Sequence, residues 1–290
     1  MTVGTYTLLD SGNFQKLEQV GAFKIVRPAA QAVWRPRLPE AEWRSADATF
    51  ARFSGGDGRW ERRNRKVPES WPIAMPGGGS FQIKLTDFGH LGIFPEQQAN
   101  WLQLRELVAA RSAGGKQINV LNLFAYTGGS TLACAAGGAN VTHLDASKTS
   151  VAWARENAEV SGLADRPVRW LTDDVQKFVA RELRRGSKYH GIILDPPSYG
   201  RGPKGEAWKI EEMLPPLLDD LRQLLAPDFA FVLLSSHSAG YTPLALTNLL
   251  GDFGHSPDVQ LQAEEMVVVD QAGRALPSGA TCLLTTAGDN

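Results

Sequence analysis

Residues 120–132 read VLNLFAYTGGSTL, and this stretch decides the fold. An apolar run typical of a buried strand leads into a turn that contains Gly128 and Gly129, and a helical pattern follows. Glycine lets the backbone approach a ligand closely, and the first turn of a helix offers unpaired N–H groups. The turn does not match G-x-G-x-x-G, so it indicates a ligand site without fixing the ligand.

Strand and helix patterns alternate around this turn. After a helix over 95–110, we expect strands over 119–124, 141–145, 168–171, 191–195 and 229–235, separated by helices beginning at 131, 148, 175 and 210. Residues 259–270 and 280–286 flank a Gly-containing turn and predict an antiparallel hairpin. The pattern predicts an α/β fold with a doubly wound, seven-stranded, mostly parallel sheet covered on both faces.

Residues 1–88 have a different character. They are rich in Gly, Pro, Trp and Arg and show no strong helical period. Residues 16–26 and 81–85 alternate apolar and polar side chains, as half-buried strands do, and turn residues separate them. We therefore expect two domains: a small β-rich N-terminal module over 1–88, a candidate for substrate recognition, and the α/β domain over 89–290.

The whole-chain charge hides an uneven distribution. The chain has 30 Lys and Arg against 31 Asp and Glu, a net of -1, whereas residues 1–116 carry a net of +5 and the remainder a net of -6. Residues 59–66 read RWERRNRK. We expect phosphate contacts from Arg62, Arg63, Arg65 and Lys66, the basic side chains that we predict to bind a nucleic-acid substrate. Trp60 could stack on a base, and a solvated loop is the alternative reading of the run.

Acidic residues follow three consecutive predicted strands, where ligands bind in open α/β sheets. Asp145 ends the second strand and can accept both hydroxyls of a ribose, or else cap the next helix. Asp173 and Asp174 follow the third strand, so one can cap a helix while the other accepts a hydrogen bond from an adenine amino group. Residues 194–200 read LDPPSYG, a rigid loop after the fourth strand that begins with Asp195.

These motifs together resemble the class I S-adenosylmethionine-dependent methyltransferases, and most closely the bacterial branch with the 23S ribosomal RNA large-subunit methyltransferases I and K. The resemblance runs from Gly89 to the C-terminus. Residues 92–98, GIFPEQQ, are similar to the family's G-aromatic-aromatic-L-D-Q-R segment with the Arg replaced, and residues 124–129 match F-x-Y-T-G-G. The resemblance implies S-adenosylmethionine as cofactor. It implies a cofactor site of Phe94, Gln97, Phe124, Tyr126, Thr127, Gly128, Gly129, Asp145, Ala146, Asp173, Asp174, Val175 and Asp195.

The resemblance also implies the catalytic loop, formed by Asp195, Pro196, Pro197 and Tyr199. In the family's N-methylating loop, D-P-P-aromatic, the aromatic comes one residue earlier than Tyr199 does here. The relatives that methylate C5 of cytosine carry a nucleophilic Cys after the fifth strand, in a segment that here reads SSHS with His237 at the Cys position. An imidazole does not replace a thiolate in that chemistry. We therefore predict methyl transfer to an RNA base, in ribosomal RNA foremost, without a Cys nucleophile.

Residues 201–208 mix cations, glycines and an aromatic, which predicts a flexible lid with Arg201 and Lys204 on the substrate, or else a plain surface loop. Cys134 and Cys282 lie apart without ligand spacing, so we expect no metal. The chain shows neither a signal peptide nor an apolar run of about 20 residues, so we expect a cytoplasmic protein without a membrane partner. The pattern leaves the oligomeric state open.

Three alternatives remain at this point. A nicotinamide-dependent oxidoreductase would also use a Gly-containing turn and an acid after the second strand, but it is disfavoured by the missing G-x-G-x-x-G and by the D-P-P loop. A relative that kept the fold and binds RNA without catalysis is the second. A methyltransferase that acts on a protein or on a small molecule is the third.

Overall fold

The computed structural model describes residues 4–53, 58–202, 205–254 and 258–287. The chain forms two compact units, and the chain passes between them more than once. The N-terminal unit contains Met1–Gln98 and Val267–Ser278, and the C-terminal unit contains Ala99–Met266 and Gly279–Asn290. Among the helices of these described ranges, none is long and apolar enough to cross a membrane.

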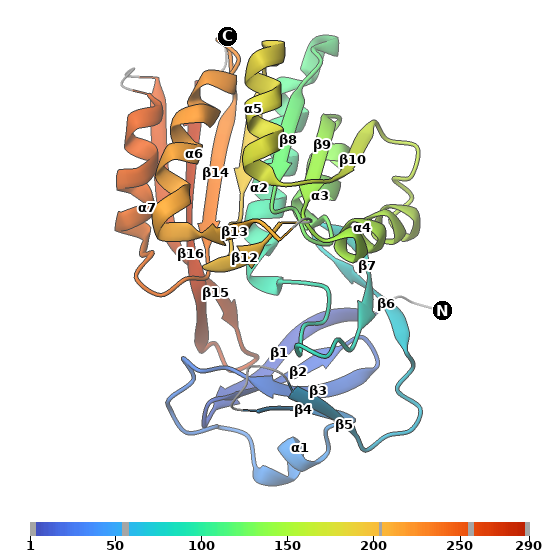
Figure 1. The fold of residues 1–290 in the computed structure, drawn as a ribbon. Helices are drawn as coiled ribbons and strands as arrows, with labels where there is room; N and C mark the ends of the chain where they lie inside the picture. The colour runs from blue at the N-terminus through green and yellow to red at the C-terminus, as the bar shows by residue number, and fades with distance from the viewer. Residues whose placement is uncertain (1–3, 54–57, 203–204, 255–257, 288–290) are drawn as a thin grey trace. The chain divides into compact units, whose positions relative to one another are not determined.

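The N-terminal unit is built on a seven-stranded sheet of order β5-β4-β3-β2-β1-β6-β7 (Figure 1). The strands are β1 Gly4–Gly12, β2 Gln15–Val20, β3 Phe23–Pro28, β4 Ala48–Arg52, β5 Gly58–Arg62, β6 Ser70–Met75 and β7 Gly79–Lys84, and helix α1 spans Glu40–Arg44. The β3–β4 and β1–β6 pairs are parallel, whereas the other pairs are antiparallel. The unit is thus β-rich, as its alternating sequence pattern predicts.

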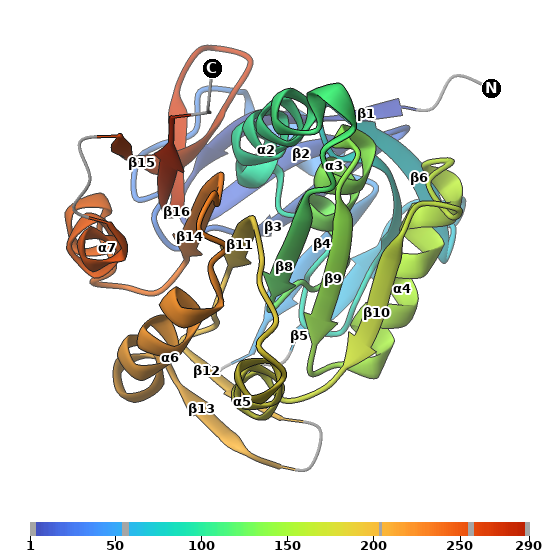
Figure 2. The ribbon, with the colours of Figure 1, turned by 90° about the horizontal axis from the view of Figure 1, so that it is seen from above.

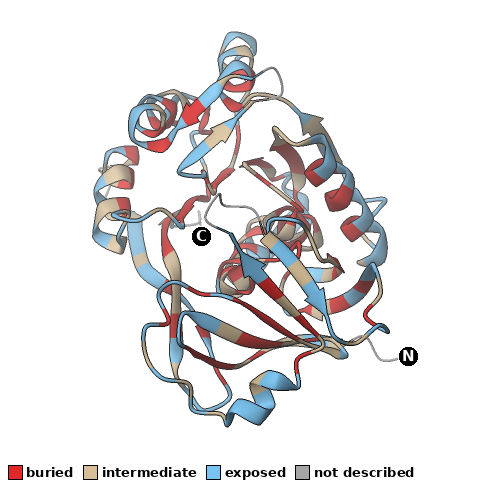
Figure 3. Ribbon diagram, turned by 60° about the horizontal axis from the view of Figure 1, so that its bottom comes forward, coloured by how far each residue is buried: buried red, intermediate tan, exposed pale blue. Residues whose placement is uncertain are grey.

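Buried residues alternate with less buried ones along β6, and Figure 3 colours the ribbon by this burial. In β6, Trp71, Ile73 and Met75 are buried and the residues between them are not. An ion pair is buried as well: Arg27 donates from Nε and Nη2 to the two Glu18 carboxylate oxygens, each at 2.7 Å. Although burial raises the pKa of Glu18, the charges of Arg27 and Lys16 lower it to about 2.

The unit boundary lies at Gln98 and not at residue 88, which corrects the expected position. The reason is that the segment after β7 folds back on this sheet. Lys84 N–H donates to the Leu91 carbonyl oxygen at 3.3 Å, and Arg27 Nη1 donates to the Gly89 carbonyl oxygen at 3.0 Å. The tip of the C-terminal hairpin also belongs here, because Leu276 packs in an apolar cluster with Leu8.

The C-terminal unit contains a seven-stranded sheet of order β10-β9-β8-β11-β14-β16-β15. Its strands are β8 Asn119–Leu123, β9 Asn140–Asp145, β10 Val168–Thr172, β11 Gly191–Leu194, β14 Phe231–Ser236, β15 Val259–Val269 and β16 Ala275–Thr286. Its helices are α2 Gln98–Arg111, α3 Gly129–Gly137, α4 Lys148–Val160, α5 Val175–Arg185, α6 Ile210–Leu224 and α7 Pro243–Leu250. Strands β10, β9, β8, β11 and β14 are parallel, and β16 runs antiparallel to β14, which confirms the predicted sheet.

Helices cover both faces of this sheet (Figure 2). One face carries an apolar cluster under α5, α6 and α7, with Phe178, Leu218 and Leu246 among its buried members. The other face carries a cluster with Leu104 of α2 and Ala135 of α3. Because β8 lies between β9 and β11, the strand order reverses at the carboxyl end of β8, and ligands bind at such a point in doubly wound sheets.

Two elements differ from the expected ones. Helix α7 falls in a stretch for which the pattern predicted no helix. The expected lid loop forms two short antiparallel strands, β12 Tyr199–Arg201 and β13 Ala207–Lys209, so the plain-loop interpretation of 201–208 is wrong. Three short 3-10 turns, η1 Pro95–Gln97, η2 Ala113–Gly115 and η3 Gly251–Phe253, complete the described elements.

Candidate active site

The turn between β8 and α3 has an unusual backbone. Phe124 and Tyr126 adopt left-handed conformations with φ of 55° and 47°, and Gly128 has φ of 90°. Residues with a Cβ atom rarely occupy this region, so the surrounding structure must impose it. The Ala125 N–H donates to the Leu144 carbonyl oxygen at 3.1 Å, and the Tyr126 N–H donates to Asp145 Oδ2 at 2.8 Å. The turn is therefore fixed against the end of β9.

The start of α3 has no side-chain cap among the described residues. Its N-cap is Gly128. A Cβ atom on Gly129 would lie 2.4 Å from the Trp101 ring, so close packing requires glycine there. The first N–H groups of a helix have no partner inside it, and they suit a carboxylate or a phosphate.

Asp145 links the turn to the start of the next helix. Its Oδ2 accepts the Tyr126 N–H, and its Oδ1 accepts the Ser147 N–H at 2.8 Å. The N-cap of α4 is Ser147, whose hydroxyl oxygen accepts from the Ser150 N–H, so the expectation that Asp145 caps this helix is wrong. Burial raises the pKa of the Asp145 carboxyl. Each carboxylate oxygen has a second lone pair, so Asp145 can still accept hydrogen bonds from two hydroxyl groups of a ligand that lies beside Ala146.

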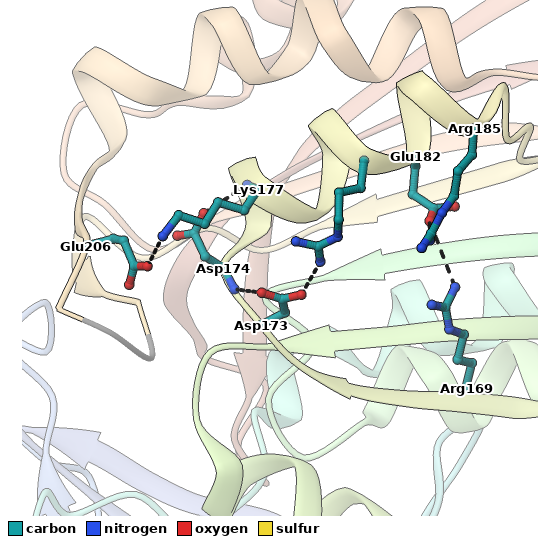
Figure 4. Close-up of polar contacts among 8 residues, drawn as sticks. Arg169, Asp173, Asp174, Lys177, Glu182, Arg185 and Glu206 are labelled. Carbon is teal, nitrogen blue, oxygen red and sulfur yellow. Dashed lines mark hydrogen bonds and ion pairs between the residues drawn. The ribbon is translucent and has the colours of Figure 1, made fainter.

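The two acids after β10 have different roles (Figure 4). Asp174 is the N-cap of α5, since its Oδ1 accepts the Lys177 N–H at 2.9 Å. Asp173 accepts the Asp174 N–H at 2.9 Å and forms an ion pair with Arg181. The Asp173 N–H donates to the Asp145 carbonyl oxygen at 3.1 Å, which brings the ends of β9 and β10 together. Because one oxygen of Asp174 serves the cap, its Oδ2 is the oxygen left to meet a ligand.

The loop after β11 is held from two sides. The Trp208 indole N–H donates to the Pro197 carbonyl oxygen at 2.7 Å, and the Ser198 and Ser238 hydroxyl oxygens are 2.7 Å apart. Asp195 Oδ1 lies 3.7 Å from Nε2 of His237. The residue at the position of the Cys nucleophile in the resembled C5 methyltransferases thus lies beside the carboxylate of the D-P-P loop.

Strands β12 and β13 form a small hairpin beside these loops. Trp208 of β13 is buried against Phe124, with ring centroids 4.8 Å apart. On β12, Tyr199 is 55% exposed and Arg201 is exposed as well. Glu206 forms an ion pair with Lys177 of α5 (Figure 4). The hairpin is thus attached both to the turn after β8 and to the start of α5.

A buried polar network that the motifs did not indicate lies under the turn. Asn122 Nδ2 donates to Thr131 Oγ1 at 2.9 Å, and that hydroxyl oxygen is 2.9 Å from Nδ1 of His143. All three side chains are buried. The signal was present in the sequence, since Asn122 and His143 interrupt strand patterns that are otherwise apolar.

The predicted residues that follow β8, β9, β10 and β11 lie at the carboxyl ends of neighbouring strands of the C-terminal sheet. The predicted cofactor contacts Phe94 and Gln97 belong to the N-terminal unit. In that unit, Arg62, Arg63, Arg65 and Lys66 are exposed. The Trp60 side chain contacts other residues of its own unit. Its indole N–H donates to the Thr86 carbonyl oxygen at 2.7 Å, and its ring packs on Phe50. Lys204 lies outside the described residues. Within the described ranges, no group of three or more metal-ligating side chains occurs.

Comparison with known proteins finds relatives of this chain. The sequence model of the S-adenosylmethionine-dependent methyltransferases matches residues 57–234. The ribosomal RNA large subunit methyltransferases K/L of Shewanella frigidimarina and Shewanella baltica are each 32% identical to this chain, over 52% and 53% of it. The matches cover 20% and 21% of those relatives, so the chain spans about a fifth of their length.

Solved structures agree over nearly the whole chain. A SAM-dependent methyltransferase from Agrobacterium tumefaciens is 38% identical with a TM-score of 0.90, and the match covers 98% of this chain and 91% of that one. A protein from Streptococcus mutans shares the fold at 18% identity and a TM-score of 0.73, over 99% of this chain and 76% of that one.

Proposed function

The chain belongs to the S-adenosylmethionine-dependent methyltransferase family, and we propose that it transfers a methyl group from S-adenosylmethionine to a base of RNA, ribosomal RNA in particular. The observation that carries the proposal is that Asp145, Asp174 and Asp195 follow the carboxyl ends of strands of one parallel sheet, as does the uncapped start of α3. The names of the curated relatives support RNA as the substrate. Membership of this family decides against the nicotinamide-dependent alternative.

The side chains at this edge of the sheet fit S-adenosylmethionine. The N–H groups at the start of α3 suit the methionine carboxylate, the remaining lone pairs of Asp145 suit the ribose hydroxyls, and Asp174 Oδ2 suits the adenine amino group. When bound, the cofactor supplies an electrophilic methyl group on a sulfonium. Because such a displacement needs alignment more than acid or base catalysis, the fixed turn and the D-P-P loop serve mainly to position the reactants.

Neither thiol of the chain suits a covalent mechanism. Cys134 in α3 and Cys282 in β16 are both fully buried. Burial raises the pKa of the Cys134 thiol and raises that of Cys282 to about 11. A nucleophilic thiol needs access and a lowered pKa, so these two are unsuited to attack a base. A covalent complex trapped on RNA that contains 5-fluorocytidine would contradict a mechanism without a Cys nucleophile.

The loop after β11 offers a place for a base that has left its helix. Exposed Tyr199 provides a ring on which the base can stack, and Asp195 provides an acceptor for an amino group of that base. A cofactor held by Asp145 and Asp174 would supply its methyl group to that amino nitrogen and would leave as the neutral thioether. The nitrogen then releases one proton, and we assign Asp195 to accept it.

Substitution of Asp195 tests this assignment. We expect Asp195→Ala to lower methyl transfer more than about 100-fold, because the base loses its acceptor, and to leave the affinity for S-adenosylhomocysteine within several-fold in calorimetry. Asp219→Ala is the matched control, since Asp219 is exposed on α6 and pairs with Arg222. Retained turnover in Asp195→Ala would refute the assigned role.

The substrate is identified by mass spectrometry of nucleosides. RNA from cells with and without the gene is digested and its nucleosides are compared. The purified chain and methyl-labelled S-adenosylmethionine are then incubated with undigested RNA from the cells without the gene, which lacks the modification. We expect label in one methylated nucleoside of ribosomal RNA. Label in protein or in a small molecule, with none in RNA, would contradict an RNA substrate. Binding of RNA with no transfer to any acceptor would favour the non-catalytic alternative.

A further inference from the structure

A pocket in the N-terminal unit brings together arginines from three separate segments. The cavity measures about 680 Å³, and its described lining contains Arg35, Arg44 and Arg63 with one acid, Glu40. Arg63 Nη1 donates to the Arg44 carbonyl oxygen at 2.9 Å, which holds the Arg63 side chain against α1. Glu40 pairs with Arg44 at 2.5 Å, and Glu61, outside the lining, is 3.7 Å from Arg63. Since Glu40 offsets Arg44 and Glu61 offsets part of the charge of Arg63, the net positive charge of the lining comes mainly from Arg35.

The buried carboxylate of Asp10 fixes the wall of this pocket. Its Oδ2 accepts the N–H groups of Arg37 and Leu38 at 2.9 and 2.8 Å, and the Trp43 indole N–H at 3.3 Å. Leu38 and Trp43 both line the pocket. These hydrogen bonds connect the segment after Arg35 to α1, so the backbone that carries Arg35 and Arg44 is held in place.

An exposed aromatic residue is a chain neighbour of two residues that line the pocket. Phe14 lies between the lining residues Asn13 and Gln15 and is 59% exposed. Asn13 and Phe14 both have left-handed backbones, with φ of 48° and 62°. The Asn13 N–H donates to the Trp34 carbonyl oxygen at 2.7 Å, and the Phe14 N–H donates to the Ala32 carbonyl oxygen at 2.8 Å. Asn13 and Phe14 form the two-residue loop between β1 and β2, and a tight hairpin loop of this length requires positive φ at both positions. The hairpin therefore presents a large apolar ring to solvent at a position that a bulky residue rarely occupies.

We propose that this pocket and Phe14 bind a single-stranded segment of RNA, with Arg35 and Arg63 on a phosphate and Phe14 stacked on a base. The guanidinium group donates in a plane that matches phosphate oxygens. A basic groove beside an aromatic ring suits single strands of any sequence, because every base has a face on which to stack. The choice of RNA rests on the proposed function, and the inference goes beyond it by placing a second RNA contact outside the methyltransferase unit.

The site differs from the predicted phosphate-binding run. Of that run only Arg63 lines the pocket, whereas Arg62, Arg65 and Lys66 do not. Arg35 and Arg44 come from segments with no run of basic residues. The sequence did not predict this pocket because residues distant in sequence meet here only through the fold.

Fluorescence anisotropy of the full chain with a fluorescein-labelled single-stranded RNA of about 12 nucleotides tests the proposal. We expect Phe14→Gly to weaken binding about tenfold. Because glycine accepts φ of 62° without strain, the same variant should unfold at an equal or higher temperature. We expect Arg35→Ala with Arg63→Ala to weaken binding at least as much. The slope of log Kd against log salt should fall by about 0.7 for each phosphate that the variant no longer neutralises.

Matched controls separate the pocket from the module's general charge and apolar surface. Phe88→Ala removes an aromatic ring that is 60% exposed, and Arg52→Ala removes an exposed arginine on the face of β4 opposite to Thr49 of the lining. Both should bind the probe as the unsubstituted chain does. Equal losses of affinity in the control and pocket variants would overturn the proposal. Displacement of the probe by uridine monophosphate at a concentration near the Kd of the probe would also overturn it.

The result is distinguishable from a failure of the proposed function. Pocket variants that keep their affinity for S-adenosylhomocysteine and lose affinity for the probe support the site. Probe binding by the unsubstituted chain that no pocket variant weakens overturns the site and leaves the methyltransferase proposal standing. If the unsubstituted chain binds no single-stranded probe, the pocket proposal is overturned, whereas nucleoside mass spectrometry still decides the RNA substrate separately.

Discussion

At the residue scale, His143 shows how a buried network supports the strained turn. Thr131 Oγ1 accepts the Asn122 amide N–H and lies 2.9 Å from His143 Nδ1, so one buried hydroxyl group connects side chains of β8 and β9. Burial lowers the pKa of His143 to about 3. The imidazole is therefore neutral at physiological pH and acts through hydrogen bonds and packing.

This burial makes stability depend on pH. The folded pKa of His143 is about 3 and the unfolded value is about 6.5, so below pH 6.5 the unfolded chain binds a proton that the folded chain does not. The free energy of unfolding should thus decrease as the pH is lowered, by about 2 kcal/mol from pH 7 to pH 5 for this group alone. Urea unfolding at both pH values should show that part of the dependence lost in His143→Gln and kept in His90→Gln, the exposed control. An identical pH dependence in all three proteins would contradict the buried neutral state.

Individual residues also mark what the motifs could reveal of the site. The order of Gly128, Asp145, Asp174 and Asp195 along the chain was enough to place them at one edge of the sheet, because parallel strands bring their carboxyl ends together. The left-handed backbones at Phe124 and Tyr126 had no signal, since the sequence shows residue types that avoid that region. The roles of the capping residues also had no signal, because Ser147 and Asp145 both suit a helix start.

At the scale of elements, apolar periodicity predicted the strands and helices of the C-terminal unit closely. It missed the apolar helix α7, and it also failed at a polar stretch. Residues 199–209 contain glycines and charges that read as a loop, yet they form β12 and β13, because buried Trp208 anchors the pair on Phe124. Contacts between distant segments hold this element, namely the Trp208–Phe124 packing, the Trp208–Pro197 hydrogen bond and the Glu206–Lys177 ion pair, and periodicity within a short window does not register them.

Trp208 is therefore expected to link the hairpin to the D-P-P loop. Trp208→Phe keeps an aromatic ring for packing on Phe124 and removes the N–H group that donates to the Pro197 carbonyl oxygen. We expect it to lower the free energy of unfolding by about 1 kcal/mol and the turnover number about tenfold, while the affinity for S-adenosylhomocysteine changes less than threefold. Steady-state kinetics and calorimetry on the same preparation separate these effects. A turnover number equal to that of the unsubstituted chain would show that this hydrogen bond does not position the loop.

At the scale of the whole molecule, the division into units could not be derived from composition. A shift from Gly- and Pro-rich sequence to alternating strands and helices located the change near residue 88. The N-terminal unit, however, extends to Gln98 and includes Val267–Ser278, which arrive from the far end of the chain. Discontinuous units depend on tertiary contacts such as the Leu8–Asp270 bridge, and a scan along the sequence does not see them.

The hairpin tip should accordingly stabilise a unit formed mainly by the first 98 residues. Leu276 is 1% exposed and packs with Leu8 and Ala32, so Leu276→Ala leaves a cavity and should cost about 2–5 kcal/mol in the stability of that unit. Leu261→Ala, on the same hairpin but 37% exposed, is the matched control and should cost under about 1 kcal/mol. Hydrogen exchange followed by mass spectrometry locates the effect. Protection should fall in peptides from β1 to β3, which lie at the opposite end of the chain from the substitution. If exchange rises only within β15 and β16, the tip is held by the unit without stabilising it.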